Sequence, residues 1–182
     1  MTMVRHCLFF ALKPPAVEAA RIGRLAAQLR AEHGLSGRPL RDERFHITLV
    51  HLGTTEQPPD PALVEAARRA GESLAWPAFE LAFDQLLSFG RGEGHHPWVL
   101  GGGAGLDGVR ALHASLVSCL AREGLRPGRQ RYVPHLTLLY DERSLAPQAL
   151  AVPGWRADEL QLIDSLQGLT RHELLGRWPA SG

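Results

Sequence analysis

The chain carries one short pattern, His-x-Thr-Leu, twice, each time within an apolar stretch that predicts a β-strand. The first copy is FHITL at residues 45–49, and the second is PHLTL at residues 134–138. Side chains of a strand alternate between its two faces, so a His and a Thr two positions apart point to the same side. The aliphatic residues between them then point into a core. Each copy therefore predicts one imidazole and one hydroxyl on a shared face.

Hydrophobic periodicity predicts that the whole chain consists of two similar halves. We expect strands near residues 4–12, 45–53, 76–89, 97–101, 131–140, 157–166 and 169–177, helices near 16–32, 61–74 and 106–123, and a short helix or loop around Pro147. This order predicts an α+β fold with two pseudo-symmetric lobes, each a mostly antiparallel sheet with helices on its outer face. Both lobes would belong to one domain over residues 1–182. The motif strands, near 45–53 and 131–140, should lie side by side across a central cleft.

The bulk composition is that of an ordinary globular chain. With 182 residues, 45% of them hydrophobic, the chain is long enough for a sizeable core. The formal net charge of +1 argues against a protein that holds a long nucleic acid by charge alone. Apart from Lys13 every basic residue other than histidine is an arginine, whose planar fork suits phosphate oxygens.

The two cysteines, Cys7 and Cys119, predict reduced core residues rather than a disulfide framework or a zinc site. Arg5 and His6 interrupt the apolar N-terminal run, so we expect no signal peptide. No apolar run reaches the length of a membrane span. Together these features predict a cytoplasmic protein that does not associate with a membrane.

Two imidazoles and two hydroxyls on one surface suit an in-line displacement at phosphorus. The pKa of histidine lies near neutral pH, so His46 and His135 can act as one general acid and one general base. The hydroxyls of Thr48 and Thr137 can hold the non-bridging oxygens. The carboxylate cluster that would hold Mg²⁺ is missing from the sequence, so neither a metal nor another cofactor is expected.

Four segments resemble the 2H phosphoesterase superfamily, and within it the bacterial RNA 2′,3′-cyclic phosphodiesterases, once called 2′-5′ RNA ligases. They are LFFALKPP at 8–15, FHITLVHLG at 45–53, RYVPHLTLLY at 131–140 and LQLIDSLQGLTRHELLGRWP at 160–179. The resemblance covers almost the whole chain and implies a bilobal fold with a metal-independent reaction. In that reaction the cyclic phosphodiester at an RNA 3′ end is opened to a 2′-phosphate.

The resemblance also implies roles for the motif residues. His46 corresponds to the proton donor to the leaving 3′ oxygen, and His135 to the base that activates water. Thr48 and Thr137 correspond to the hydroxyls that hold the phosphate. Because the residues alone do not distinguish the two histidines, this assignment rests on the resemblance.

One position departs from the family pattern. Many members carry Arg two positions after the second Thr-Leu, where this chain has Tyr140. Tyr140 offers a hydroxyl and a stacking face instead, and Arg129 or Arg131 could supply the missing charge. This departure bears on phosphate affinity and on substrate choice.

Several further residues are candidates for contacts with RNA or have structural interpretations. Phe9 could stack on a base, although core packing also explains it. Arg41 and Arg44, just before the first motif, could line an RNA path or belong to a solvated connection. His51 has odd spacing from His46, which in a regular strand predicts the opposite face.

Two loops could suggest a metal site or a phosphate-binding loop, but their sequence patterns match neither. His95 and His96 lack an evident third metal ligand, so we interpret them as a solvated hairpin tip. The glycine-rich segment 101–105 matches neither phosphate-binding loop pattern and is interpreted as a flexible connection.

Three functions remain open from the sequence. The first is hydrolysis of RNA 2′,3′-cyclic phosphate ends by the two-histidine mechanism, with RNA 3′ ends or cyclic nucleotides as ligands. The second is reversible 2′-5′ RNA ligation, in which a 5′-hydroxyl replaces water. The third is a non-catalytic module that binds RNA ends or nucleotides. For each of them a monomer is expected.

Overall fold

The computed structural model describes residues 4–90, 93–128 and 131–181. The elements in chain order are β1 (Arg5–Leu12), α1 (Ala16–Glu32), η1 (Asp42–Arg44), β2 (Ile47–Thr55), α2 (Pro61–Glu72), β3 (Phe79–Ser88), β4 (His96–Gly101), η2 (Ala104–Leu106), α3 (Asp107–Arg122), β5 (Leu136–Asp141), β6 (Gln148–Ala157), β7 (Glu159–Gln167) and β8 (Arg171–Pro179). Here η denotes a short 3₁₀ helix. The start of α2 is capped, because the side chain of Asp60 accepts a hydrogen bond from the Ala62 backbone N–H.

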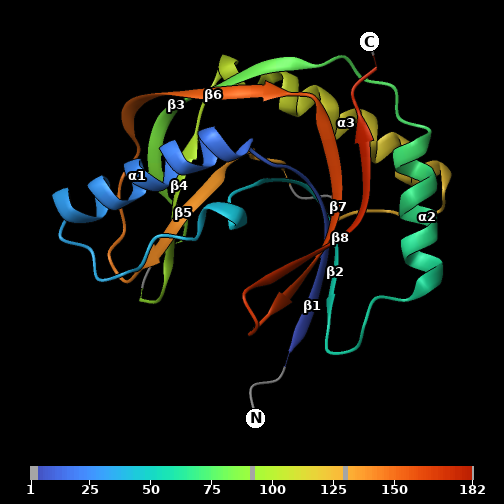
Figure 1. The fold of residues 1–182 in the computed structure, drawn as a ribbon, viewed down its shortest axis with the longest axis horizontal. Coiled ribbons are helices and arrows are strands. Elements are labelled where there is room, and N and C mark those ends of the chain that lie inside the picture. The colour runs from blue at the N-terminus through green and yellow to red at the C-terminus, as the bar shows by residue number, and fades with distance from the viewer. Residues whose placement is uncertain (1–3, 91–92, 129–130, 182) are drawn as a thin grey trace.

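The eight strands form one curled sheet in the order β6-β3-β4-β5-β2-β1-β7-β8, and all neighbours in this order are antiparallel (Figure 1). The motif strands β2 and β5 lie at its centre, with three further strands on each side. A single register pair, Ile47 with Leu136, joins the two halves. The predicted α+β fold with adjacent motif strands is therefore confirmed, and the two lobes are halves of one sheet.

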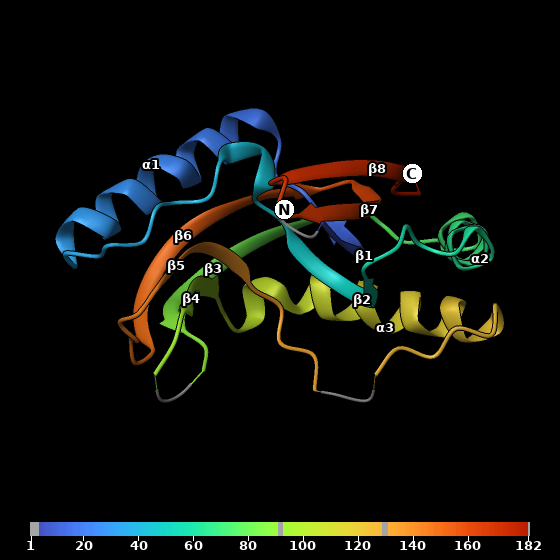
Figure 2. The same ribbon diagram turned by 90° about the horizontal axis from the view of Figure 1, so that it is seen from below.

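The helices lie on different sides of the sheet. Figure 2 shows α1 and α3 on opposite sides of the molecule, with strands between them. Helix α1 packs against β5, and Arg21 donates hydrogen bonds to the carbonyls of Pro153 and Gly154 in β6. Helix α3 packs against β2 and β3, while α2 packs against α3, β7 and β8. Helix α1 follows β1 in the chain but thus packs against the half of the sheet that contains β5 and β6.

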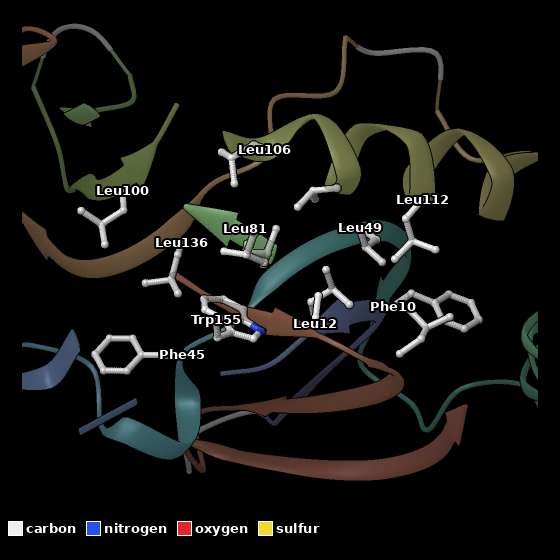
Figure 3. Packing of buried hydrophobic residues seen from close by; sticks show 14 of the residues in the cluster. Phe10, Leu12, Phe45, Leu49, Leu81, Leu100, Leu106, Leu112, Leu136 and Trp155 are labelled. Atoms are coloured by element: carbon white, nitrogen blue, oxygen red, sulfur yellow. The ribbon is translucent and has the colours of Figure 1, made fainter. Parts of the chain in front are cut away.

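One hydrophobic core connects the two halves. Figure 3 shows side chains from β1, β2, β3, β4, β5, β6 and α3 that pack together. Leu12, Ile47 and Leu136 are fully buried in this cluster. The residues between His and Thr of both motifs therefore anchor the centre of the sheet, as strand alternation predicts.

The strand β6 differs from the sequence-based expectation, which places a short helix or loop around Pro147 and a strand only from about residue 157. Pro153 and Gly154 interrupt the pattern of this segment and disfavour a strand. The structure tolerates Pro153 because β6 is an edge strand of the sheet. An edge strand can hold a proline, since one side of its backbone needs no ladder partner.

The first motif strand contains a β-bulge directly after its Thr. Consecutive residues of β1 pair with Thr48 and Val50, so that Leu49 is the extra residue. Leu49 and Val50 are both buried as a result. His51 then pairs with Phe9, whose ring lies on the His46 side of the sheet. The bulge therefore brings His51 to the same face as the motif.

The second motif strand repeats this bulge at the equivalent position. Consecutive residues of β4 pair with Thr137 and Leu139, which makes Leu138 the extra residue. Leu138 and Leu139 are both buried, and Tyr140, which follows them, is exposed. The two halves thus share a local backbone irregularity as well as a motif, and Tyr140 occupies the place that His51 has in the first half.

Candidate active site

The register between β2 and β5 brings the two motifs together. The pairing at the centre of the sheet sets His46 opposite Thr137 and Thr48 opposite His135, one residue to either side of the matched pair. These four side chains lie on the face opposite the core. Diagonal neighbours in an antiparallel pair are about 7–8 Å apart, so the two imidazoles can face one small ligand from two sides.

Each motif histidine is oriented by its own backbone. The Nδ1 of His46 lies 2.7 Å from the carbonyl oxygen of Arg44, and that of His135 lies 2.8 Å from the carbonyl oxygen of Val133. A carbonyl can only accept, so Nδ1–H must donate in both rings. This fixes the tautomer and leaves Nε2 as the nitrogen that can exchange a proton with a ligand.

Aromatic rings hold both imidazoles in place. His46 stacks on Phe9, with ring centroids 4.9 Å apart and an interplanar angle of 24°. The ring of His172, from β8, packs edge to face against that of His46, with ring centroids 5.4 Å apart. His135 meets Phe89 edge to face at 4.7 Å. Such packing restricts ring rotation, which suits groups that must transfer protons in a defined direction.

Burial lowers the pKa of both motif histidines. For His46 burial is the main cause, and the cations Lys13 and Arg44 and the neighbouring His135 contribute, so that its pKa falls to about 4. Burial also lowers the pKa of His135. Both hydrogen bonds to backbone carbonyls act in the opposite direction. Without a ligand, His46 is therefore neutral at pH 7.

A cavity of about 640 Å³ opens beside His135. Its wall includes Thr48, His51, Phe89, His113, Arg131, Tyr132 and His135. The Tyr132 hydroxyl donates a hydrogen bond to the Thr48 carbonyl, and the Tyr132 ring stacks on His113 at 3.8 Å with an interplanar angle of 9°. The wall thus combines aliphatic side chains with aromatic and imidazole rings, one of which, His113, comes from α3.

The remaining candidates for RNA or phosphate contacts lie in different environments. Arg131 is exposed and lines the cavity beside His135. Arg129 lies outside the described residues. Tyr140 is 49% exposed and close enough to Arg44 to affect the pKa of that guanidinium. Phe9 is only 4% exposed and lies behind His46, so it supports the imidazole more than it presents a surface to a base.

The structure corrects two interpretations of histidines outside the motifs. His51 was expected on the opposite face of the sheet from His46. The bulge instead places it on the same face as His46, where it lines the cavity. His96 was expected at a solvated hairpin tip, but it begins β4 and is 4% exposed, with its Nδ1 near the Phe89 carbonyl. His95 is exposed, as expected.

Three residues beside the motifs have no recognisable sequence signal. His113 is a single polar residue on the apolar pattern of α3, and Tyr132 is one of two tyrosines. His172 belongs to a terminal hairpin far along the chain from His46. His113 and His172 come close to the motifs only through the packing of α3 and the pairing of β7 with β8, whereas Tyr132 lies three residues before His135 in the chain.

Within residues 4–90, 93–128 and 131–181, no group of three or more His, Cys, Asp or Glu side chains is placed to hold a metal ion. No helix in the same ranges has the length and hydropathy that a bilayer span requires. Cys7 and Cys119 are both free thiols.

The sheet, with a His-x-Thr-Leu strand on each side of its centre, is that of the 2H phosphoesterase class. The model of the 2′-5′ RNA ligase superfamily matches residues 14–169. The chain belongs to this superfamily, and the resemblance drawn from its motifs is confirmed.

Individual relatives agree with this assignment. The RNA 2′,3′-cyclic phosphodiesterase of Aeropyrum pernix is 35% identical over 129 residues, which span 64% of this chain and 65% of that protein. The Escherichia coli protein of the same name is 30% identical over 181 residues, 94% of each chain. The crystal structure of E. coli LigT complexed with 3′-AMP has a TM-score of 0.72 at 28% identity, and covers 98% of this chain and 99% of that one.

Proposed function

We propose that this protein hydrolyses RNA 2′,3′-cyclic phosphate ends to 2′-phosphates. The observation that carries the proposal is the diagonal placement of His46 and His135, each with Nδ1 bound to a carbonyl and Nε2 left for the ligand. The names of two relatives, both RNA 2′,3′-cyclic phosphodiesterases, support the same activity.

In the proposed reaction the two histidines act on opposite sides of the phosphorus. Nε2 of His135 takes a proton from water as the water oxygen bonds to phosphorus. The bond from phosphorus to the 3′ oxygen breaks, and Nε2 of His46 gives that oxygen a proton. The product carries a 2′-phosphate and a free 3′-hydroxyl. His46 acquires its proton when the anionic phosphate binds, since a neighbouring negative charge raises the pKa of an imidazole.

The threonine hydroxyls hold the non-bridging oxygens in this scheme. We expect Thr48→Val and Thr137→Val each to lower kcat/KM by about 10- to 100-fold, because each removes one hydrogen bond to an anionic centre and keeps the side-chain shape. Kinetics on a 2′,3′-cyclic nucleotide measure this effect, with Thr→Ser variants as matched controls. A valine variant at either position with wild-type kcat/KM would remove that threonine from the scheme.

The identity of the product tests the proposed function most directly. We expect a nucleoside 2′,3′-cyclic phosphate to yield only the 2′-phosphate, in the presence of EDTA as well as in its absence. Chromatography against authentic 2′- and 3′-phosphates distinguishes the products. A 3′-phosphate product would reverse the leaving group, and loss of turnover in EDTA would contradict a metal-independent reaction.

Reversible 2′-5′ ligation is a second candidate, favoured by the cavity of about 640 Å³ beside His135. If His135 is the base, the nucleophile approaches from this side, where there is space for the 5′ end of a second RNA strand. Hydrolysis should still dominate in dilute RNA because water is abundant. Assays in both directions with a pair of tRNA halves measure the balance.

Nucleotide binding is also part of the proposal, and E. coli LigT, solved with 3′-AMP, supports it. A cytoplasmic location, a monomeric state and one domain over residues 1–182 stay predictions. Sedimentation of the purified chain would test the monomer.

A further inference from the structure

A second cavity, of about 440 Å³, adjoins the site on the His46 side. It lies between η1 with the end of β1 and the turn from β7 to β8. Its lining residues are Lys13, Arg41, Glu43, Arg44, Leu169, Thr170, Arg171 and His172. We call it the basic pocket. Its wall is continuous with the active site, because the ring of His172 contacts both His46 and Phe9.

The basic pocket has an excess of positive charge. Its lining has four basic side chains and a single carboxylate, that of Glu43. The basic residues are Lys13, Arg41, Arg44 and Arg171. Arg41 forms an exposed ion pair with Glu43 at 3.8 Å, and Arg171 pairs with Glu173. Lys13 donates to the backbone carbonyl of Glu43 rather than to a carboxylate. Lys13 and Arg44 therefore keep charge that an anion can neutralise.

Arg44 and His172 carry buried polar atoms that lack partners among the described residues. In Arg44 these atoms are Nε and Nη1, and in His172 they are both ring nitrogens. Buried polar atoms in folded proteins are almost always hydrogen-bonded, to protein, water or a ligand. A phosphate group supplies several acceptor oxygens at once, and a guanidinium can bind two of them. The donors among these atoms, the Arg44 N–H groups and the single N–H of a neutral His172, therefore point to an oxyanion ligand.

The position of the basic pocket indicates which phosphate it would hold. In an in-line displacement the leaving oxygen lies on the side of the acid, opposite the nucleophile. If His46 is the acid, the ribose that carries the 3′ oxygen, and the strand attached to it, extend on the His46 side. The basic pocket lies on that side, whereas the larger cavity lies beside His135.

We propose that the basic pocket binds the phosphate of the internucleotide link next to the reacting 3′ end. This inference rests on the proposed function and adds the substrate class, namely RNA strands in preference to cyclic mononucleotides. Arg44 and Lys13 provide the charge, and His172 provides a hydrogen bond. The backbone carbonyl of Arg44 orients His46 while its side chain binds the strand, so one residue links the two sites.

A double variant with a charge-matched control tests the basic pocket. The test protein is Lys13→Gln/Arg44→Gln, and the control is Arg24→Gln/Arg30→Gln on the exposed face of α1, which loses the same charge. The measured quantity is the ratio of kcat/KM for a hexanucleotide with a 2′,3′-cyclic phosphate end to that for a cyclic mononucleotide. We expect this ratio to fall at least about tenfold in the test protein, as for the loss of a hydrogen bond to a charged group, and to stay constant in the control.

Binding provides a readout that does not need turnover. Fluorescence anisotropy with a labelled hexanucleotide that ends in a 2′-phosphate gives Kd as a function of salt concentration. We expect weaker binding by the test protein and a salt slope reduced by about 0.7, the value for one phosphate that is no longer neutralised, relative to the control. If the double variant fails to fold, as judged by circular dichroism, Lys13→Gln with Arg24→Gln as its control measures the contribution of Lys13 to affinity and slope.

The outcomes separate the two proposals. If the wild type opens cyclic phosphates and the ratio and the salt slope are the same in test and control proteins, the basic pocket does not bind the strand, while the proposed function stands. If no cyclic phosphate is opened, the proposed function fails and the anisotropy difference alone decides whether the pocket binds RNA. A reduced ratio together with a reduced slope supports both.

Discussion

Replacing His46 or His135 by alanine is expected to lower kcat for a 2′,3′-cyclic nucleotide by about 10²- to 10⁴-fold, the usual contribution of a general acid or base. Both imidazoles lie on the face of the sheet opposite the core, so the fold should persist. The effects of the two substitutions should not add, because in the proposed reaction both residues act on the same displacement. The double variant is therefore expected to be little slower than the worse single variant.

Steady-state kinetics in EDTA, with melting temperature as the check on folding, measure these effects. His95→Ala is a matched control, since it removes an exposed imidazole outside the motifs. Because His46 stacks on Phe9, His46→Asn is a second variant that retains a polar side chain. Hydrolysis at a near-wild-type rate by a folded His46 or His135 variant would refute the acid–base assignment.

A strong decline of kcat/KM with rising pH is the second large effect we expect. In the proposed mechanism the active form of the free enzyme has one motif histidine protonated and the other neutral. Burial lowers both pKa values below the usual 6.5, that of His46 to about 4. A lowered pKa means that the proton is lost at lower pH, so above about pH 6.5 both rings are mostly neutral. The singly protonated form, and kcat/KM with it, should then fall tenfold per pH unit.

Initial rates between pH 5.5 and 8.5 at low substrate concentration test this expectation. Log kcat/KM should approach a slope of −1 in the upper part of the range, equivalent to about a 100-fold loss over two pH units. The decline of kcat should begin at higher pH, because the bound phosphate anion raises the pKa of the imidazoles. A level or rising kcat/KM between pH 7 and 8.5 would contradict the pKa directions in the free protein.

Much of the fold followed from local pattern. The helices begin and end within two residues of their predicted bounds. The missed strand β6 shows where such reasoning stops. Pro153 disfavours a strand unless the strand lies at a sheet edge, and that position is a property of the assembled sheet rather than of residues 148–157.

The candidate site likewise has a part that local sequence predicts and a part that depends on the assembled sheet. His46 and Thr48 share a face because strand geometry is local, and so do His135 and Thr137. Their assembly into one site depends on the register of β2 with β5, which hydrogen bonds between distant segments set. The placement of His51 failed because a bulge depends on the partner strand, which a single strand's alternation cannot show.

The sequence by itself determined the repeated motif on which the proposed chemistry rests: two His-x-Thr units, each with its polar side chains on one face and its aliphatic side chains in a core. Only the tertiary structure decided what surrounds that chemistry. Three features require segments far apart in the chain to meet. They are the equivalent bulges that turn His51 and Tyr140 to the motif face, the contact of His172 with His46, and the unpartnered nitrogens of Arg44. Alternation is a property of one strand, whereas register, bulges and pockets are properties of the strands that pair.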